Sequence, residues 1–278
     1  MTAGRLVYDA SVAAAGLLFF LMGRRALRAN AFDEALMSRV VIVGLAGAWI
    51  GARLAHVLDR AGFSGLGDGE LAAGGASYLG GFLLAFAVLA LAVAPRGRRL
   101  ALFDALSVPL ALAYAVGRVG CHLAADGCYG QPTSLPWGVH YEWGLRPSGV
   151  RVHPTPLYEA VASGALALGL SCRTLRRSPA GARLAVFLFG SGVARFAVEF
   201  VRRNERHGEW TQAQWLSSAL VLVALVLLAR LARGRGERPE TPRLRTNPQR
   251  RSRDEATGTV EFLRLSGANS VAGKPRSR

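Results

Sequence analysis

Apolar residues in this chain gather in long continuous blocks separated by short polar stretches, and they do not recur at the spacing of one helix face. Each block approaches the length of about 20 residues that a helix needs to cross a bilayer. The pattern predicts an all-α, polytopic membrane protein with about seven transmembrane helices. The predicted spans are Leu6–Met22, Val40–Leu58, Ala76–Ala94, Leu100–Val116, Pro156–Cys172, Leu184–Val201 and Ala213–Leu231.

Arginine positions orient these spans. Basic clusters follow the first, third, fifth and seventh spans, as the positive-inside rule expects for an outside N-terminus and a cytoplasmic C-terminus. Arg202, Arg203 and Arg206 after the sixth span weaken this pattern. Because more arginines follow the first block than precede it, we expect that block to be a retained span and not a cleaved signal peptide.

Composition agrees with a membrane protein. Hydrophobic residues make up 51% of the chain and charged residues 19%, below the roughly 25% charged residues of a soluble domain. Part of the net charge of +16 comes from residues 233–278, which hold twelve basic and five acidic residues. We therefore predict a membrane domain over 1–232 and a disordered basic tail over 233–278. The tail is interpreted as contacting anionic lipid or as simply solvated, and not as binding nucleic acid.

The longest polar interval, Arg118 to Thr155, separates the predicted fourth and fifth spans and is expected on the periplasmic side. It is rich in glycine and proline, and its tyrosines and tryptophans are expected at the level of lipid headgroups. A loop of this length between short connections is more often functional than filler. These aromatic residues are Tyr129, Trp137, Tyr141 and Trp143.

Charged residues within or at the edge of the spans are the first candidates for function. Arg118 ends the fourth span, where its guanidinium would either bind a phosphate or anchor the helix at the bilayer surface. Arg195 and Glu199 lie four residues apart in the sixth span and therefore share a helical face. Charges at that depth need partners or a wet cavity. The two form either a structural ion pair or a pair that directs Arg195 toward an anionic substrate.

Other spans contribute polar residues to the same interior. Glu159 lies one turn inside the fifth span, and we expect it to orient an arginine. Arg53 and His56 lie in the second span and Asp104 in the fourth. We expect Arg53 and Asp104 to form an ion pair between helices.

Four residues after Arg118 have the side-chain types of metal ligands, namely Cys121, His122, Asp126 and Cys128. Their spacing matches no familiar zinc pattern, in which paired Cys-x-x-Cys units are the strong signal, so no metal site is predicted. On the oxidising side of the membrane, a disulfide between Cys121 and Cys128 is an alternative to two free thiols.

Seven short motifs combine glycine, charged and aromatic residues in an ordered series between about residues 6 and 231. They are Ile50-Gly51-Ala52-Arg53-Leu54, Gly74-Gly75-Ala76-Ser77-Tyr78-Leu79-Gly80-Gly81, Gly117-Arg118-Val119-Gly120, Pro132-Thr133 with Pro136-Trp137-Gly138-Val139, His153-Pro154-Thr155-Pro156-Leu157-Tyr158-Glu159, Gly192 to Arg202, and Gln214-Trp215-Leu216-Ser217. The series resembles prolipoprotein diacylglyceryl transferase, the membrane enzyme that modifies bacterial lipoprotein precursors.

The chain departs from that family at three places. Cys121 stands where the family signature has Asn, and Ala124-Ala125-Asp126 replaces its Asn-x-Glu. Leu79 replaces a His or Tyr and has no group that accepts or donates a proton. The chain therefore resembles a divergent branch.

The resemblance implies a bacterial inner-membrane enzyme whose substrates are phosphatidylglycerol and the signal peptide of a prolipoprotein. The lipobox cysteine sulfur would attack the glycerol carbon next to phosphate, giving a thioether and glycerol phosphate without any cofactor. Arg118 and Arg195 would bind the phosphate, with Glu159 and Glu199 orienting them. The base would be His153, with His122 and Tyr78 as alternatives. The implied substrate-binding set also includes Tyr78, Tyr158 and Arg53.

Two other functions are alternatives to this transferase activity. One is a fold relative that acts on an anionic lipid without transferring it to prolipoprotein. The other is a transporter or lipid-binding protein that uses the same arginines as anion sites, although no inverted repeat is evident.

Overall fold

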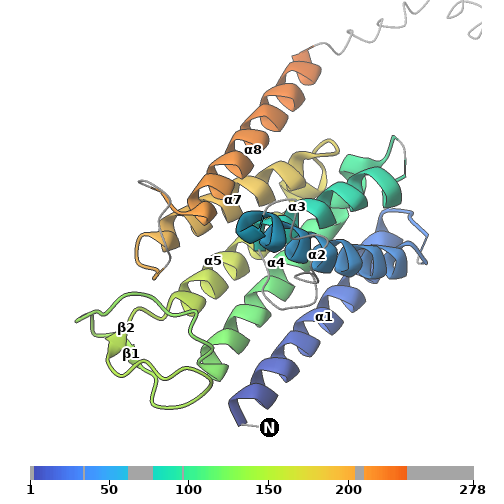
Figure 1. The fold of residues 1–278 in the computed structure, drawn as a ribbon. Helices are drawn as coiled ribbons and strands as arrows, with labels where there is room; N and C mark the ends of the chain where they lie inside the picture. Colours follow the sequence, from blue (N-terminus) through green and yellow to red (C-terminus); the bar gives the residue numbers. More distant parts are fainter. Residues whose placement is uncertain (1–2, 34, 62–77, 96, 204–209, 237–278) are drawn as a thin grey trace, which may run out of the picture. The chain divides into compact units, whose positions relative to one another are not determined.

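The computed structural model describes residues 3–33, 35–61, 78–95, 97–203 and 210–236 of the chain. These residues are mostly helical, and a short two-stranded sheet lies in the loop that precedes α5 (Figure 1). The elements are α1 (Ala3–Ala29), α2 (Ala35–Ala61), α3 (Tyr78–Val88), the π-helical turn η2 (Leu89–Val93), α4 (Arg99–Ala124), β1 (Val139–His140), β2 (Arg151–Val152), α5 (Thr155–Leu170), α6 (Arg173–Arg176), α7 (Ala182–Glu199) and α8 (Gln212–Gly236).

Each of the seven predicted spans coincides with a helix, although the third begins at Ala76, outside the described residues. Within the described ranges, four helices are long and apolar enough to cross a membrane, namely α1, α2, α4 and α8. Large apolar side chains on several helices are exposed, including Ile42 at 67% and Leu168 at 76%. Such exposure on helices suits contact with lipid. The protein is therefore an all-α, multi-pass membrane protein, and the total of seven spans stays a prediction.

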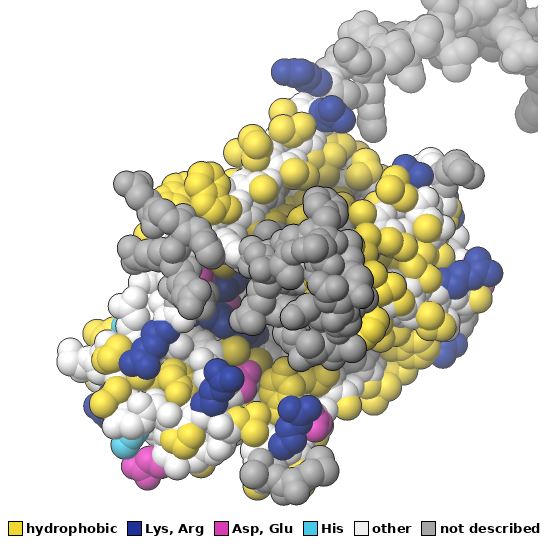
Figure 2. Space-filling view, in the orientation of Figure 1, with side chains coloured by type: hydrophobic (Ala, Val, Ile, Leu, Met, Phe, Trp, Pro, Cys, Tyr) yellow, Lys and Arg dark blue, Asp and Glu magenta, His cyan; other side chains and the backbone are white. Residues whose placement is uncertain are grey.

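Apolar side chains cover much of the helical part of the face in Figure 2 that is not drawn in grey, and Lys and Arg side chains lie at its top, at its right edge and over the lower left. This distribution is typical of a membrane protein, in which charged side chains reach the bilayer surfaces and apolar ones cover the interval between them.

The packing of α4 positions the site, because this helix contacts α1, α5 and α7. α2 packs against α3, and glycines bring these two backbones together. A Cβ at Gly81 would lie 2.7 Å from the carbonyl oxygen of Ala48, and one at Gly80 would collide with Gly51 and Ala55. Gly80 and Gly81 therefore allow close packing of α3 against α2.

The predicted ion pair between Arg53 and Asp104 is wrong. The two carboxylate oxygens of Asp104 accept hydrogen bonds of 2.7 Å from the backbone N–H groups of Gly181 and Leu184. These donors lie at the start of α7, where the first N–H groups of a helix have no partner within it. Asp104 thus caps a neighbouring helix, and Arg53 lies over the ring of Trp49 on its own helix.

The loop between α4 and α5 folds back on itself and onto the end of α7. β1 and β2 pair antiparallel, with Val139 opposite Val152. Ala125, Tyr141 and Val152 form a small buried core beneath this hairpin. Gly130 pairs with Arg202 in an isolated β-bridge, so the loop is fixed to the segment that follows α7.

Candidate active site

Glu159 is the centre of the candidate site. It lies one turn into α5, whose first residues are Thr155 and Pro156, and proline is well suited to a position where the N–H needs no helical partner. Its side chain is only 3% exposed. A carboxylate so deeply buried needs charged partners, because burying an unpaired charge costs several kcal/mol.

Three arginines supply those partners. Arg118 Nε from α4 lies 2.8 Å from Glu159 Oε2, and Arg195 Nη1 from α7 lies 3.2 Å from Oε1. Arg202 Nη1, just beyond α7, lies 3.2 Å from Oε1 and 3.3 Å from Oε2. In the described part of the chain, these are the ion-pair partners of Glu159, so one carboxylate joins three segments. We call Glu159, Glu199 and the three arginines the arginine cluster.

Glu199 completes the arginine cluster. Its Oε2 lies 2.7 Å from Arg195 Nη1, which confirms the expected pairing of these two residues one turn apart on α7. Among the described residues, the three guanidinium groups and two carboxylates of the cluster sum to one net positive charge. The three arginine side chains are 12–21% exposed. The arrangement is therefore complementary to a single anionic group, such as a phosphodiester, that approaches the cluster.

Arg202 was not among the residues assigned to the site from the sequence. Its spacing was nevertheless a usable signal, because Arg195, Glu199 and Arg202 follow one another at intervals of four and three residues. Residues with this spacing lie on one face of a helix. α7 ends at Glu199, and the backbone beyond it still delivers the Arg202 guanidinium to the same carboxylate.

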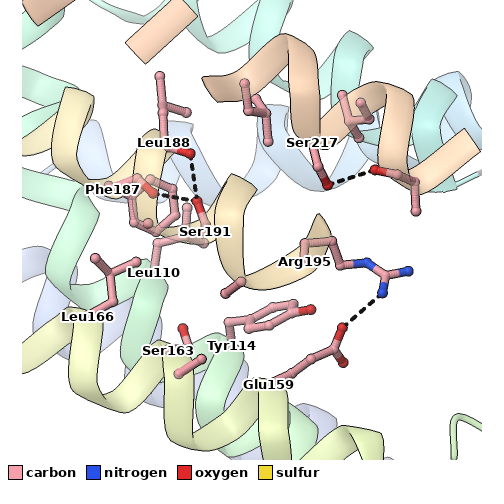
Figure 3. Close-up of a pocket in the computed structure, with 16 residues that line it drawn as sticks. Leu110, Tyr114, Glu159, Ser163, Leu166, Phe187, Leu188, Ser191, Arg195 and Ser217 are labelled. Atoms are coloured by element: carbon pink, nitrogen blue, oxygen red, sulfur yellow. Dashed lines mark hydrogen bonds and ion pairs between the residues drawn. The ribbon is translucent and has the colours of Figure 1, made fainter. Parts of the chain in front are cut away.

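A cavity of about 200 Å³ opens beside the arginine cluster, between α4, α5, α7 and α8 (Figure 3). Arg195 and Glu159 point toward one another at one end of it, and Leu110, Phe187 and Leu188 belong to its largely apolar wall. An apolar space next to a cationic group is complementary to an amphiphile with an anionic headgroup. The remaining lining residues are Tyr114, Ala162, Ser163, Leu166, Gly190, Ser191, Ala194, Ala213, Leu216, Ser217 and Leu220.

The histidines assigned as bases from the sequence contact tyrosines. His153 Nδ1 lies 3.3 Å from the hydroxyl of Tyr158, which also accepts a hydrogen bond from Trp137 Nε1 at 2.8 Å. His122 Nδ1 lies 2.7 Å from the hydroxyl of Tyr141. Neither histidine forms an ion pair with Glu159 or Glu199 in the described part of the chain. Their roles as bases stay predictions.

Other assigned residues are not brought into the arginine cluster. Arg53 of α2 is not an ion-pair partner of Glu159 or Glu199 among the described residues. The backbone of Tyr78 begins α3, but the side chains of Tyr78, Leu79 and His56 lie outside the described residues. The structure therefore leaves the substrate-binding roles of Arg53 and Tyr78 as predictions.

Two thiols and a carboxylate lie beside the arginine cluster. Cys121 and Cys128 are separate thiols, and Asp126 lies between them in sequence. A hydrogen bond from the Cys121 thiol and the charge of the Arg202 guanidinium lower the pKa of Cys128 to about 7, against the opposing effects of burial and of Asp126. The backbone carbonyl of Cys128 accepts a hydrogen bond of 2.6 Å from Thr155 Oγ1. The loop is thus fixed one helical turn before Glu159.

Comparison with known proteins identifies a family whose members are similar to this chain in sequence. Residues 6–230 match the family model described as prolipoprotein diacylglyceryl transferase. Several relatives carry the name phosphatidylglycerol–prolipoprotein diacylglyceryl transferase. The one from Nitrosomonas europaea is 30% identical over 85% of this chain and 89% of its own length. Those from Methylococcus capsulatus and Nitrosospira multiformis are 32% and 30% identical, over 81% and 76% of this chain and 88% and 76% of their own lengths.

Proposed function

Because the chain belongs to the prolipoprotein diacylglyceryl transferase family, we propose that it transfers the diacylglyceryl group of phosphatidylglycerol to the cysteine thiol of a prolipoprotein. The cysteine sulfur forms a bond to the glycerol carbon next to phosphate. The bond between that carbon and the phosphate oxygen breaks, and glycerol phosphate leaves. The products are a thioether-linked lipid on the protein and a phosphate monoester.

The observation that carries this proposal is the arginine cluster with its single net positive charge beside an apolar cavity. The phosphodiester of phosphatidylglycerol has one negative charge and is attached to hydrocarbon. The leaving phosphate gains further negative charge as the carbon–oxygen bond breaks. Guanidinium groups held in place before the reaction stabilise that developing charge without having to reorganise.

We assign binding of the phosphate group of the lipid to Arg118, Arg195 and Arg202. Glu159 and Glu199 are positioning residues, because they hold the guanidinium groups through ion pairs of 2.7–3.3 Å. The apolar wall of the cavity accommodates hydrocarbon of the lipid. His153, which contacts Tyr158, stays the predicted base, and Tyr158 stays in the predicted substrate-binding set.

We place the reaction at the extracytoplasmic surface of the bacterial inner membrane. The arginine cluster lies at the C-terminal end of α4 and the N-terminal end of α5, whereas Arg98 and Arg99 begin α4 at its opposite end. The positive-inside rule assigns the basic end to the cytoplasm. Signal peptides of exported prolipoproteins would reach the site from the outer leaflet.

The test is transfer by the purified full-length protein in vesicles of phosphatidylglycerol, with a peptide that carries a lipobox cysteine. Mass spectrometry of the peptide should show the added diacylglyceryl group. Arg118→Ala should lower kcat/KM by about 10²–10³-fold, the range measured for loss of one donor to a developing oxyanion. Arg203→Ala is the matched control, since Arg203 is exposed. A folded wild-type protein that binds phosphatidylglycerol but forms no thioether would favour a lipid-binding or transport function instead.

A further inference from the structure

The turn after α4 brings together three side chains with the chemistry of metal ligands. One sulfur from Cys121, one from Cys128 and a carboxylate oxygen from Asp126 all lie within 4.8 Å of one another. All three side chains are partly buried. The sequence spacing predicted no metal site, because the three residues do not form a familiar linear motif, but the backbone of the turn makes the donors converge.

Two residues with positive φ shape the backbone of this turn. Ala125, at the end of α4, has φ 45°, and Gly127 has φ 93°. A residue other than glycine rarely adopts positive φ. The Cys128 N–H donates a hydrogen bond of 2.9 Å to Asp126 Oδ1, so one carboxylate oxygen is oriented by the backbone while a second oxygen remains on the same group. Such support from neighbouring groups is typical of metal ligands.

Two thiolates and one carboxylate are a donor set for Zn²⁺, which binds sulfur and oxygen in tetrahedral geometry. Structural zinc sites fill all four positions with protein ligands, whereas catalytic sites have three protein ligands and one open position. In the part of the chain that the structure describes, these three donors converge without a fourth protein ligand, and they therefore match the open, catalytic type.

The three donors lie beside the arginine cluster. Cys121 follows Arg118 by three residues on α4 and so shares its helical face. Cys128 is hydrogen-bonded through its carbonyl to Thr155, one turn before Glu159 on α5. Gly130, two residues later, pairs with Arg202. Segments that contribute Arg118, Glu159 and Arg202 to the cluster are thus each adjacent to the ligand turn.

The proposed reaction needs a means of ionising the substrate thiol. Only the thiolate is an adequate nucleophile, and a free cysteine has a pKa of about 8.5. In the arginine cluster, the guanidinium groups stay protonated and both carboxylates are held in ion pairs. A metal ion supplies the means of ionisation directly, because a thiol that coordinates zinc loses its proton.

We propose that Cys121, Asp126 and Cys128 bind one Zn²⁺, whose open position coordinates the prolipoprotein cysteine as a thiolate. The proposal rests on the transferase function argued above. On coordination, the substrate thiol releases its proton to solvent. The sulfur electron pair then forms the carbon–sulfur bond, and the electrons of the broken carbon–oxygen bond stay on the departing phosphate. The thioether product has no negative charge, binds zinc weakly and leaves, and the ion remains divalent throughout.

Metal content of the purified full-length protein is the first test. One zinc per chain is expected for the wild type and for Cys172→Ser, which removes a third, exposed cysteine elsewhere in the chain. Cys121→Ser and Cys128→Ser should lose the metal, and Asp126→Asn should bind it more weakly than the wild type, because a neutral amide is a poorer zinc ligand than a carboxylate. Because these variants could fail to fold, zinc is also removed from the wild type by a chelator and then restored. The proposal is overturned if the purified wild-type protein holds no metal even after reconstitution with Zn²⁺. This outcome counts against the proposal whether the two thiols are free or joined as a disulfide.

The second test distinguishes thiol coordination from a purely structural zinc. In protein loaded with Co²⁺, the sulfur-to-cobalt absorption should strengthen when a lipobox cysteine peptide is added, and it should not change with the serine peptide. An absorption that is identical with both peptides overturns the catalytic role.

The third test is the pH dependence of transfer. If zinc ionises the thiol, removing zinc should lower kcat/KM by up to about 30-fold at pH 7, where about 3% of a free cysteine is ionised. That loss should shrink to about twofold at pH 8.5. Transfer by zinc-free protein at the full rate at pH 7 overturns the inference and leaves the transferase function standing. Zinc and peptide binding without any transfer would instead refute the transferase function.

Discussion

The most informative single substitution is Glu159→Gln, because one carboxylate holds three guanidinium groups. Glutamine has nearly the same shape but no charge, and its NH₂ group would face an arginine. Glu159 is 3% exposed and its oxygens lie 2.8–3.3 Å from Arg118, Arg195 and Arg202. Removing one partner of a buried charge network typically costs about 3–5 kcal/mol. We therefore expect a clear loss of stability together with a loss of catalysis.

The size of both effects follows from the geometry. A loss of about 3–5 kcal/mol corresponds to a fall in Tm of roughly 6–20 °C, at about 2–4 °C per kcal/mol for a chain of this size class. The net charge of the arginine cluster would rise from one to two, so attraction of an anionic lipid is not weakened. Misplacement of the guanidinium groups should lower kcat by about 10²-fold, while KM for phosphatidylglycerol stays the same or falls.

The assay combines thermal unfolding in detergent with steady-state transfer in vesicles. Glu142→Gln is the matched control, because Glu142 has a side chain that is 77% exposed and pairs only with His140 among the described residues. Exposed pairs contribute about 0–1 kcal/mol, so this variant should behave as the wild type. If Glu159→Gln kept the wild-type Tm and kcat, or raised KM without changing kcat, the role of Glu159 as the residue that positions the arginines would be refuted.

Other predictions test further parts of the site. Arg202→Ala should lower kcat/KM by about 10²-fold while Arg203→Ala leaves it unchanged, and equal effects in the transfer assay would show that Arg202 has no special role. Ala194→Phe should fill the cavity and raise KM for phosphatidylglycerol about tenfold, whereas Val193→Phe, at a position 46% exposed, should not; a KM unaffected by Ala194→Phe would exclude lipid from the cavity. Asp104→Ala should lower the free energy of unfolding by about 1–2 kcal/mol through loss of the cap on α7. Thermal unfolding measures this loss, and kcat at a temperature where the variant is folded should equal that of the wild type. Thr155→Val should cost about 1–3 kcal/mol, since the Cys128 carbonyl loses its donor, and an unchanged Tm would contradict the anchoring of the loop.

The sequence by itself determined the class of protein and much of the site. Continuous apolar blocks predicted helices at the right places, because the length and hydropathy of a segment are local properties. These two properties determine whether a helix can cross the hydrocarbon core of a bilayer. The pairing of Arg195 with Glu199 was equally local, since residues four apart share a helical face. Arg118 and Glu159 stood out because charges at the edge of apolar spans are costly and need partners.

Only the tertiary structure decided which partners those charges have. Asp104 caps α7 and does not pair with Arg53, because the packing of α4 against α7 determines which donors lie within reach. Arg202 joins Glu159 across segments 43 residues apart, and the turn after α4 makes Cys121, Asp126 and Cys128 converge through two positive φ angles. Hydropathy and spacing along the chain contain no such information, since an ion pair or a ligand set between segments depends on how the helices and loops pack together.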